Sequence, residues 1–177
     1  RISFSLRARM VAHCTARTAC PHFGLLVGEQ TCLDSLGFVG LLTRSSPDVQ
    51  AALRSLERYW HFHARGAVTT LAVEGNLATL RYEIYQPRTE AVDQFGDGAV
   101  AVLFNILREL CGREWMPVEV RFAHREPKHA APFRRFFLAP LRFDAGQYSV
   151  VFSATWLKHR LPDISPELRR LLQQQID

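Results

Sequence analysis

Apolar residues recur every three or four positions in three parts of the chain, which is the spacing of an amphipathic helix. The first pattern predicts a helix over residues 47–63, with Ser46 as cap, Pro47 in the first helical position and Asp48 favouring the positive end of the helix dipole. Its apolar stripe comprises Val49, Leu53, Leu56 and Trp60, extended by His63. The other two patterns predict helices over residues 90–111 and 166–175, and Gly112 can end the first of these in a left-handed cap.

Other segments alternate between apolar and polar residues, as half-buried strands do. Residues 68–73 and 77–85 flank Glu74-Gly75-Asn76 and predict a hairpin, in which Leu80, Tyr82 and Ile84 share the buried face. Further strands are expected at residues 118–124, 141–144 and 148–152. Neither a strict alternation of strands and helices nor an all-strand run is present. We therefore expect an α+β fold, with a largely antiparallel sheet packed against amphipathic helices in a single domain over residues 1–177.

Composition agrees with an ordinary soluble globular protein: 47% of the 177 residues are hydrophobic and 22% are charged. No apolar run approaches the roughly 20 residues that span a bilayer. The basic start, residues 1–9, has neither an apolar core nor an initiator Met, which is typical of a cut fragment rather than a signal peptide. We expect a cytoplasmic protein without membrane contact.

The net charge of +5 comes from Arg residues spread along the whole chain, which favours a solvated surface over a phosphate-binding stripe. No two of the four Cys residues have the C-x-x-C spacing of zinc or redox sites, so we expect reduced and mostly buried thiols.

Glycine-punctuated apolar runs stand at residues 21–28 and 36–40, and glycine there indicates a turn or a close approach of two backbones. Together with later motifs they resemble the effector-binding domain of AraC-type transcriptional regulators. The motifs are Phe23-Gly24-Leu25 with Gly28, Leu36-Gly37 with Gly40, Ser46-Pro47-Asp48 before Ala51-Ala52-Leu53, the helix entered by Glu90, Trp115-Met116-Pro117 through Phe122 with His124 and Pro127, and Leu141-Arg142-Phe143.

The resemblance covers nearly the whole chain and implies a regulatory domain rather than an enzyme. It implies a bacterial protein in which this part binds a small-molecule effector and a second copy of itself, with no cofactor. Promoter DNA would be bound by two helix-turn-helix units, and the chain stops at Asp177 without them.

A pocket for an effector needs apolar walls and a few inward polar groups. Five residues that lie on apolar faces and carry a polar group meet this requirement and are predicted to converge on one cavity: Trp60, His63, Tyr82, His124 and Tyr148. The alternative is that each is a core residue with a satisfied polar tip, as Trp, Tyr and His often are.

Other functions have weaker support. His61 and His63 are two positions apart, so on a helix they do not face one ion, and His124 with His129 is no stronger a metal motif. A haem-based sensor would need an axial His in an apolar pocket, and a small-molecule sensor of another class is a further alternative. No catalytic motif of a hydrolase, metalloprotease, kinase or dinucleotide enzyme is present. A pure dimerisation module remains open, and differs from a sensor in that no metabolite would raise its melting temperature.

Overall fold

The computed structural model describes residues 2–162, 170, 171 and 174. The helices are α1 (Phe4–Thr18), α2 (Phe23–Glu29), α3 (Phe38–Arg44), α4 (Val49–His63), α5 (Val92–Cys111) and α6 (Ala131–Phe137), with short 3-10 helices η1 (Leu33–Leu36) and η2 (Ala154–Lys158). The strands are β1 (Ala67–Glu74), β2 (Leu77–Ile84), β3 (Glu119–Arg121), β4 (Leu141–Arg142) and β5 (Tyr148–Ser153).

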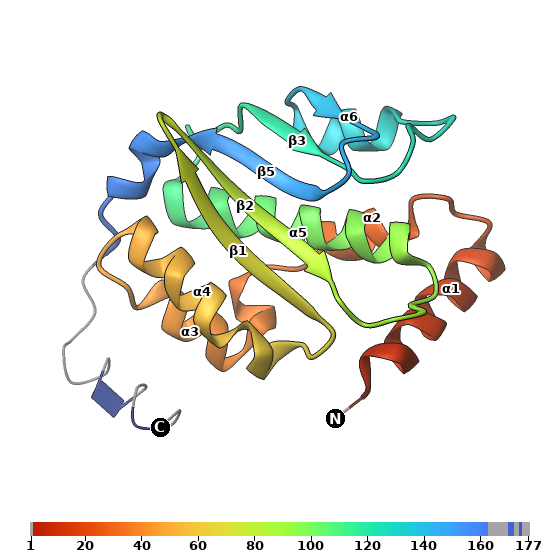
Figure 1. The fold of residues 1–177 in the computed structure, drawn as a ribbon, viewed down its shortest axis with the longest axis horizontal. Helices are drawn as coiled ribbons and strands as arrows, with labels where there is room; N and C mark the ends of the chain where they lie inside the picture. The colour runs from red at the N-terminus through yellow and green to blue at the C-terminus, as the bar shows by residue number, and fades with distance from the viewer. Residues whose placement is uncertain (1, 163–169, 172–173, 175–177) are drawn as a thin grey trace.

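The strands form one sheet in the order β1-β2-β5-β3-β4 (Figure 1). All neighbouring strands are antiparallel except β3 and β4, which are parallel and are joined through α6. The predicted α+β class and the mainly antiparallel sheet are confirmed.

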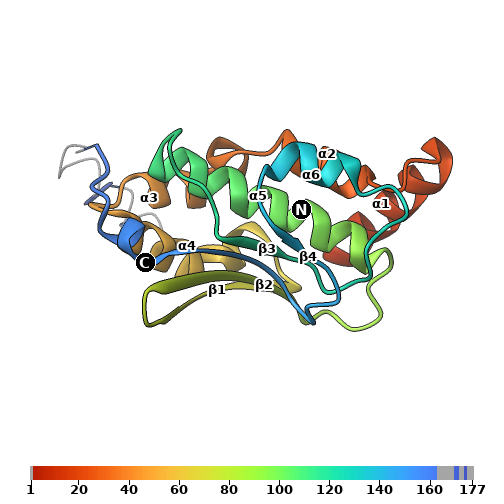
Figure 2. The same ribbon diagram turned by 90° about the horizontal axis from the view of Figure 1, so that it is seen from above.

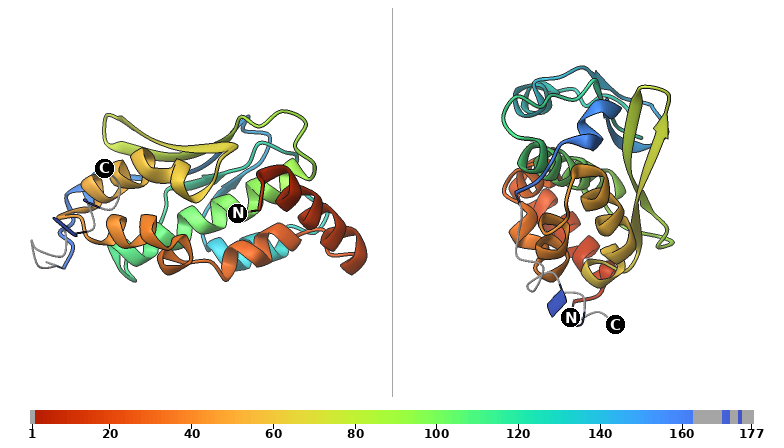
Figure 3. Two further views of the ribbon diagram at one scale, coloured as in Figure 1. Left: turned by 90° about the horizontal axis from the view of Figure 1, so that it is seen from below. Right: turned by 90° about the vertical axis from the view of Figure 1, so that its left-hand side faces the viewer.

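The helices lie in layers on one side of the sheet. In the view from above, α4 and α5 lie next to the strands, and α3 and α2 lie on the far side of these two helices (Figure 2). α1 lies across the N-terminal end of α5, where the rings of Phe4 and Phe95 are 5.0 Å apart (Figure 3). The core therefore extends through two interfaces, from sheet to α5 and from α5 to α2. Among the described helices, none combines the length and apolar character that crossing a bilayer requires.

The start of α4 differs in detail from the sequence prediction. Asp48, not Ser46, is the N-cap, and its carboxylate accepts a hydrogen bond of 2.8 Å from the backbone N–H of Ala51. Pro47 therefore precedes the cap, and its carbonyl accepts a hydrogen bond from Leu161 in the segment after β5. An Asp three residues before a free helical N–H is a better acceptor than a more distant Ser, so the helix begins two residues later than expected.

The glycines of the second helix mark a close approach of two backbones, as the sequence indicates. A Cβ on Gly24 would lie 1.9 Å from the carbonyl oxygen of Gln94, and one on Gly28 would lie 2.4 Å from that of Gly98. No larger residue fits at either position without moving α2 away from α5. The run of residues 21–28 is thus mainly a helix that crosses α5 at glycine.

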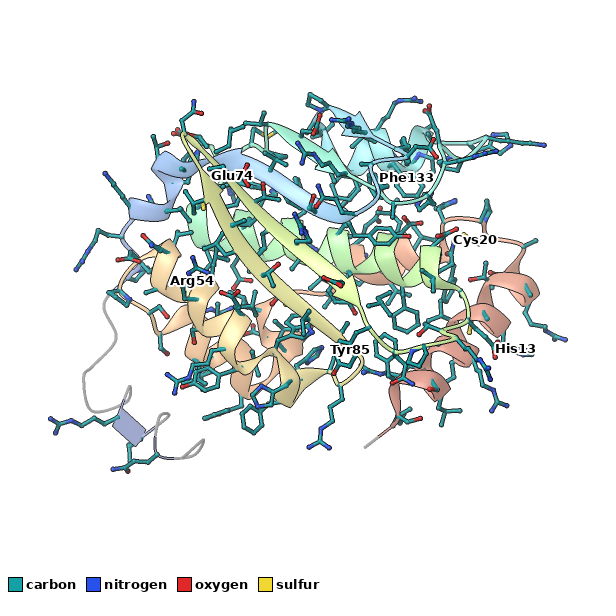
Figure 4. The ribbon with its side chains drawn as sticks, in the orientation of Figure 1. His13, Cys20, Arg54, Glu74, Tyr85 and Phe133 are labelled. Atoms are coloured by element: carbon teal, nitrogen blue, oxygen red, sulfur yellow. The ribbon has the colours of Figure 1, made fainter. Side chains whose placement is uncertain are left out.

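Between the sheet and α6 lies a cluster of aromatic rings. Phe133, labelled in Figure 4, meets Phe122 edge-on at 5.4 Å, and Phe122 stacks on Phe143 at 4.9 Å. On the α4 side, Arg54 donates a hydrogen bond of 3.0 Å to the carbonyl of Leu71 in β1. These contacts fix both ends of the sheet on the helical layer.

The other predicted elements are found with adjusted limits. The hairpin and the late strands are confirmed, and the strand expected over residues 118–124 is shorter. Gly112 follows α5 with a positive φ of 91° but with an extended ψ of −179°, so the cap is not the left-handed helical one. The helix expected over residues 166–175 lies largely outside the described residues. Of the four free thiols only Cys111 is buried and Cys32 is exposed, so the expectation of mostly buried cysteines is wrong.

Candidate ligand-binding site

A cavity of about 410 Å³ lies between α1, α2, α4 and α5, with Tyr82 of β2 reaching into its wall. Most of its lining is apolar or glycine. The lining residues are Arg7, Met10, Val11, Gly24, Val27, Gly28, Thr31, Ser35, Leu36, Trp60, His63, Ala64, Tyr82, Gln94, Phe95, Gly98, Ala99 and Val102. The glycines belong to the α2–α5 contact, so the crossing of these helices shapes one side of the cavity.

The ring of Trp60 forms part of the cavity wall. The residue is 5% exposed, and its ring meets Tyr82 edge-on at 5.9 Å and His63 at 5.3 Å. The indole Nε1 is buried and has no hydrogen-bond partner among the described residues. This atom is covered by protein, so Trp60 contributes the face of its ring to the cavity rather than a donor.

Arg7 brings a positive charge to the same cavity from α1. Ser3 caps this helix by accepting a hydrogen bond from Leu6, and the Arg7 guanidinium then lies over the ring of Phe4 at 5.6 Å. Its Nε is buried and unpartnered within the described part of the chain. Burial raises the pKa of the Tyr82 hydroxyl, while the nearby Arg7 charge acts in the opposite direction. Tyr82 therefore stays a neutral phenol near a cation.

Gln94 also lines the cavity, but its amide is committed to the framework. Its Oε1 accepts a hydrogen bond of 2.8 Å from the N–H of Gly24, and its Nε2 donates one of 2.8 Å to the carbonyl of Pro21. These two bonds hold the start of α2 against α5. The polar groups of the cavity thus divide into structural ones, such as Gln94, and others, such as the Arg7 guanidinium.

His124 and Tyr148 do not line this cavity. His124 Nε2 lies 2.7 Å from the Oδ1 of Asp97, and the Tyr148 hydroxyl donates a hydrogen bond of 3.0 Å to Asp93. Both acceptors are on the first half of α5. His124 borders a separate depression of about 380 Å³, lined by Pro21, Asp93, Gln94, Asp97, His124, Arg125, Pro127 and Phe133.

The position of α5, not the register of the sheet, explains this separation. Tyr82 and Tyr148 are directly opposite each other in the β2–β5 pair and share a face, yet α5 runs beneath that face. The Tyr148 ring lies on Gly96, where an added Cβ would come within 2.1 Å of the ring. Tyr82 reaches α4 and Trp60 on one side of α5, and Tyr148 reaches the acidic residues on the other. The structure therefore brings together Trp60, His63 and Tyr82, and places the other two predicted residues elsewhere.

The Asp97–His124 pair is a buried, charge-assisted contact. The side chains are 2% and 12% exposed. His124 Nδ1 lies 2.7 Å from the carbonyl of Arg125, which can only accept, so this nitrogen carries a proton. Burial lowers the pKa of His124, but its hydrogen bond to Asp97 and the Asp97 charge outweigh burial and raise the pKa overall. Burial also raises the pKa of Asp97, against the opposing effect of His124.

No group of three or more His, Cys, Asp or Glu side chains gathers to hold a metal ion in the part of the chain that the structure describes. Neither the cavity nor the depression beside His124 therefore offers a metal-ligand set made from these described residues.

Comparison with known proteins gives the family. Residues 1–161 match the family described as the arabinose-binding domain of AraC transcription regulator, at its N-terminal end. The chain belongs to this family. The family domain thus includes α1 and every strand, and the cavity lies within it.

A solved structure has the same fold. It is the transcriptional regulator CdpR from Pseudomonas aeruginosa, with a TM-score of 0.69 and 13% sequence identity over 97% of this chain. The match spans 62% of the CdpR chain, so this chain corresponds to part of that protein. A search of curated proteins gives no significant match.

Sequence reasoning missed Arg7, Asp97 and the cavity-lining residues of α5. A signal for Arg7 was present, because Phe4, Ala8 and Val11 repeat at helical spacing around it and Ser3 is a good cap. Asp97 stands on the buried face of α5, where an acidic residue needs a partner. That partner could not be found from spacing alone, since His124 is 27 residues away.

Proposed function

We propose that the chain is the ligand-sensing domain of an AraC-type transcriptional regulator, and that a small-molecule effector binds in the cavity between α1, α2, α4 and α5. The parent protein would be cytoplasmic and homodimeric, and would bind promoter DNA through a separate part of the chain. Membership of the AraC regulator family supports this reading, as does a structural neighbour that is itself a transcriptional regulator with additional chain. The domain would act by binding rather than by catalysis.

One observation carries the proposal: a largely apolar cavity whose lining includes the side chains of Arg7, Trp60 and Tyr82. Apolar walls with a few inward polar groups are the usual composition of small-molecule sites. The Arg7 guanidinium and the Tyr82 hydroxyl are the polar groups that would orient a ligand among these apolar walls.

The location of the cavity suggests how an effector would signal. Its walls come from α1 as well as from α4 and α5, and α1 buries only Phe4 and Ala8. A ligand that contacts α1 and α5 together would stabilise the arrangement in which α1 is docked. An effector shifts the equilibrium between two regulator states only by its difference in affinity for them, and α1 docking supplies such a difference.

A thermal-shift screen with a cavity-filling variant tests the proposal. Amino acids, fatty acids, aromatic acids and sugars are the starting set. A ligand at 100 times its dissociation constant stabilises the folded chain by about 2.7 kcal/mol, or about 5–10 °C in a domain of this size. Ala99→Phe places a ring inside the cavity and should abolish the shift. Ala72→Phe, the same substitution on an exposed site of β1, should leave it unchanged.

The proposal fails if no compound in the screen raises the melting temperature. It also fails if a shift survives in the Ala99→Phe variant, because the ligand would then bind elsewhere. Sedimentation of the chain at several concentrations tests the homodimer separately, and a strictly monomeric domain would contradict that part.

A further inference from the structure

We infer that the cavity takes an organic monocarboxylate with an apolar body, whose carboxylate meets the Arg7 guanidinium and the Tyr82 hydroxyl. This inference rests on the function proposed above and adds to it the chemical class of the ligand. It follows from the charges, the donors and the walls of the cavity, together with the groove that adjoins it.

The charge of the lining is one-sided. Arg7 carries a positive charge, and none of the lining residues is Asp or Glu. Arg7 forms no ion pair with any described residue. A guanidinium that is half-buried without a carboxylate partner leaves a site in which an anion is favoured over a neutral or cationic group.

The unpartnered polar groups are donors. The Trp60 Nε1 and the Arg7 Nε have no hydrogen-bond partner in the described part of the chain, and both atoms are covered by protein. The Arg7 side chain lines the cavity and can only donate, so the ligand group that meets its guanidinium must be an acceptor. The Tyr82 hydroxyl, which stays neutral, can provide a further donor. Two oxygens that only accept, as in a carboxylate, match this set.

The same inventory disfavours a sugar. Every hydroxyl of a polyol brings a proton that needs an acceptor, and few are open in this cavity. Gln94 Oε1 already accepts from Gly24, and the Thr31 hydroxyl already donates to the carbonyl of Val27. Several buried sugar hydroxyls would therefore lose their hydrogen bonds to water without replacement.

The remaining walls suit an apolar body. They are built from aliphatic, thioether and aromatic side chains: Met10, Val11, Val27, Leu36, Phe95 and Val102. A volume of about 410 Å³ lies within the range of small-molecule pockets. A phenyl or short alkyl chain attached to the carboxylate would contact these walls.

A second opening reaches the same cation from outside. A groove of about 710 Å³ shares Arg7 and His63 with the cavity and also contains Arg65 and His61, and no acidic residue lines it. Clefts lined by one sign of charge raise the local concentration of the opposite ion. The groove therefore provides an approach for an anion that ends at Arg7.

Isothermal titration calorimetry on the 177-residue chain tests the inference with three probes. These are 3-phenylpropanoate, its neutral amide 3-phenylpropanamide, and L-arabinose. We expect the carboxylate to bind at least about tenfold more tightly than the amide, because only the carboxylate adds a charge-assisted contact to Arg7. Arabinose should bind more weakly than either.

Variants locate the contact. Arg7→Gln should lose about tenfold in affinity for the carboxylate and should no longer distinguish it from the amide. Arg9→Gln removes a charge from an exposed position of the same helix outside the cavity and should change neither value. Trp60→Phe should weaken both probes and keep the preference for the carboxylate. Circular dichroism melting of each variant verifies that it is folded.

Equal affinity for acid and amide, or unchanged discrimination in Arg7→Gln, overturns the inference. Failure of the carboxylate to bind at concentrations up to about 10 mM also overturns the inference, because a specific site would bind this ligand with a lower dissociation constant. If arabinose or another neutral compound binds instead, and Ala99→Phe blocks it, the inference fails while the proposed function stands. The proposed function fails only if no compound binds in the cavity at all.

Discussion

Replacing His124 with Phe tests whether this side chain is a structural partner of Asp97. The substitution keeps a ring where Phe122 and Phe143 already surround the imidazole, each with its ring centre 5.7 Å away. The packing is therefore largely retained, and the main change is polar. Asp97, whose side chain is 2% exposed, loses the one side-chain hydrogen-bond partner that it has among the described residues, so it must be either ionised and unpaired or protonated.

The expected loss in the free energy of unfolding of His124→Phe follows from these two options. An unpaired buried charge costs about 3–5 kcal/mol. Protonating a carboxyl group whose ordinary pKa is 3.8 costs about 4 kcal/mol at about pH 7, at 1.4 kcal/mol per pKa unit. In the variant Asp97 adopts whichever of the two states has the lower free energy. We therefore expect the free energy of unfolding to fall by about 3–4 kcal/mol, which corresponds to about 6–16 °C in melting temperature. The deficit should shrink on acidification by up to about 1.4 kcal/mol per pH unit, since the proton becomes easier to supply.

Urea unfolding at several pH values between about 5 and 8 measures both quantities. Asp97→Asn is the matched control. It removes the buried charge, and the introduced amide can donate a hydrogen bond to the Nε2 of a neutral His124. Asp97→Asn should therefore lose clearly less free energy of unfolding than His124→Phe. A deficit below about 1 kcal/mol for His124→Phe, or one that does not change with pH, would refute the reasoning.

Two further predictions concern pH and packing. Because the folded-state pKa of His124 is raised, its stabilisation is fully present below the ordinary pKa of 6.5 and is lost as pH rises through the raised value; the urea midpoint should fall over that window in the natural sequence, and a midpoint that stays constant or rises there would contradict this. Gly24→Ala should lower the free energy of unfolding by about 3 kcal/mol or more, because its Cβ would lie 1.9 Å from the Gln94 carbonyl oxygen. Gly75→Ala, in open space at a φ of 60°, should lower it by only about 1–2 kcal/mol, and urea unfolding of the two variants measures the difference.

The candidate site was only partly predictable. Trp60, His63 and Tyr82 could be selected because each combines an apolar face with a polar group, and the structure places them around one cavity. The same criterion selected Tyr148, which lies opposite Tyr82 in the sheet but on the other side of α5. Periodicity reports that a side chain points inward. It carries no information about which side of a packed helix the side chain reaches.

By itself, the sequence determined those elements whose signal is local. The stripe of α4, the stripe of α5, the β1–β2 hairpin around Gly75 and the alternation before His124 each depend on residues within one turn or one strand pair. The glycines at positions 24 and 28 also signalled a close backbone approach, since nothing larger fits there.

Only the tertiary structure decided what those faces meet. It inserted β5 between β2 and β3, paired Asp97 with His124, and brought Arg7 from the start of the chain to the cavity that Trp60 also lines. These choices depend on contacts between segments that are far apart in sequence. Hydrophobic burial fixes which face is hidden but does not depend on direction, so the choice of partner comes from shape and polar complementarity in the assembled fold.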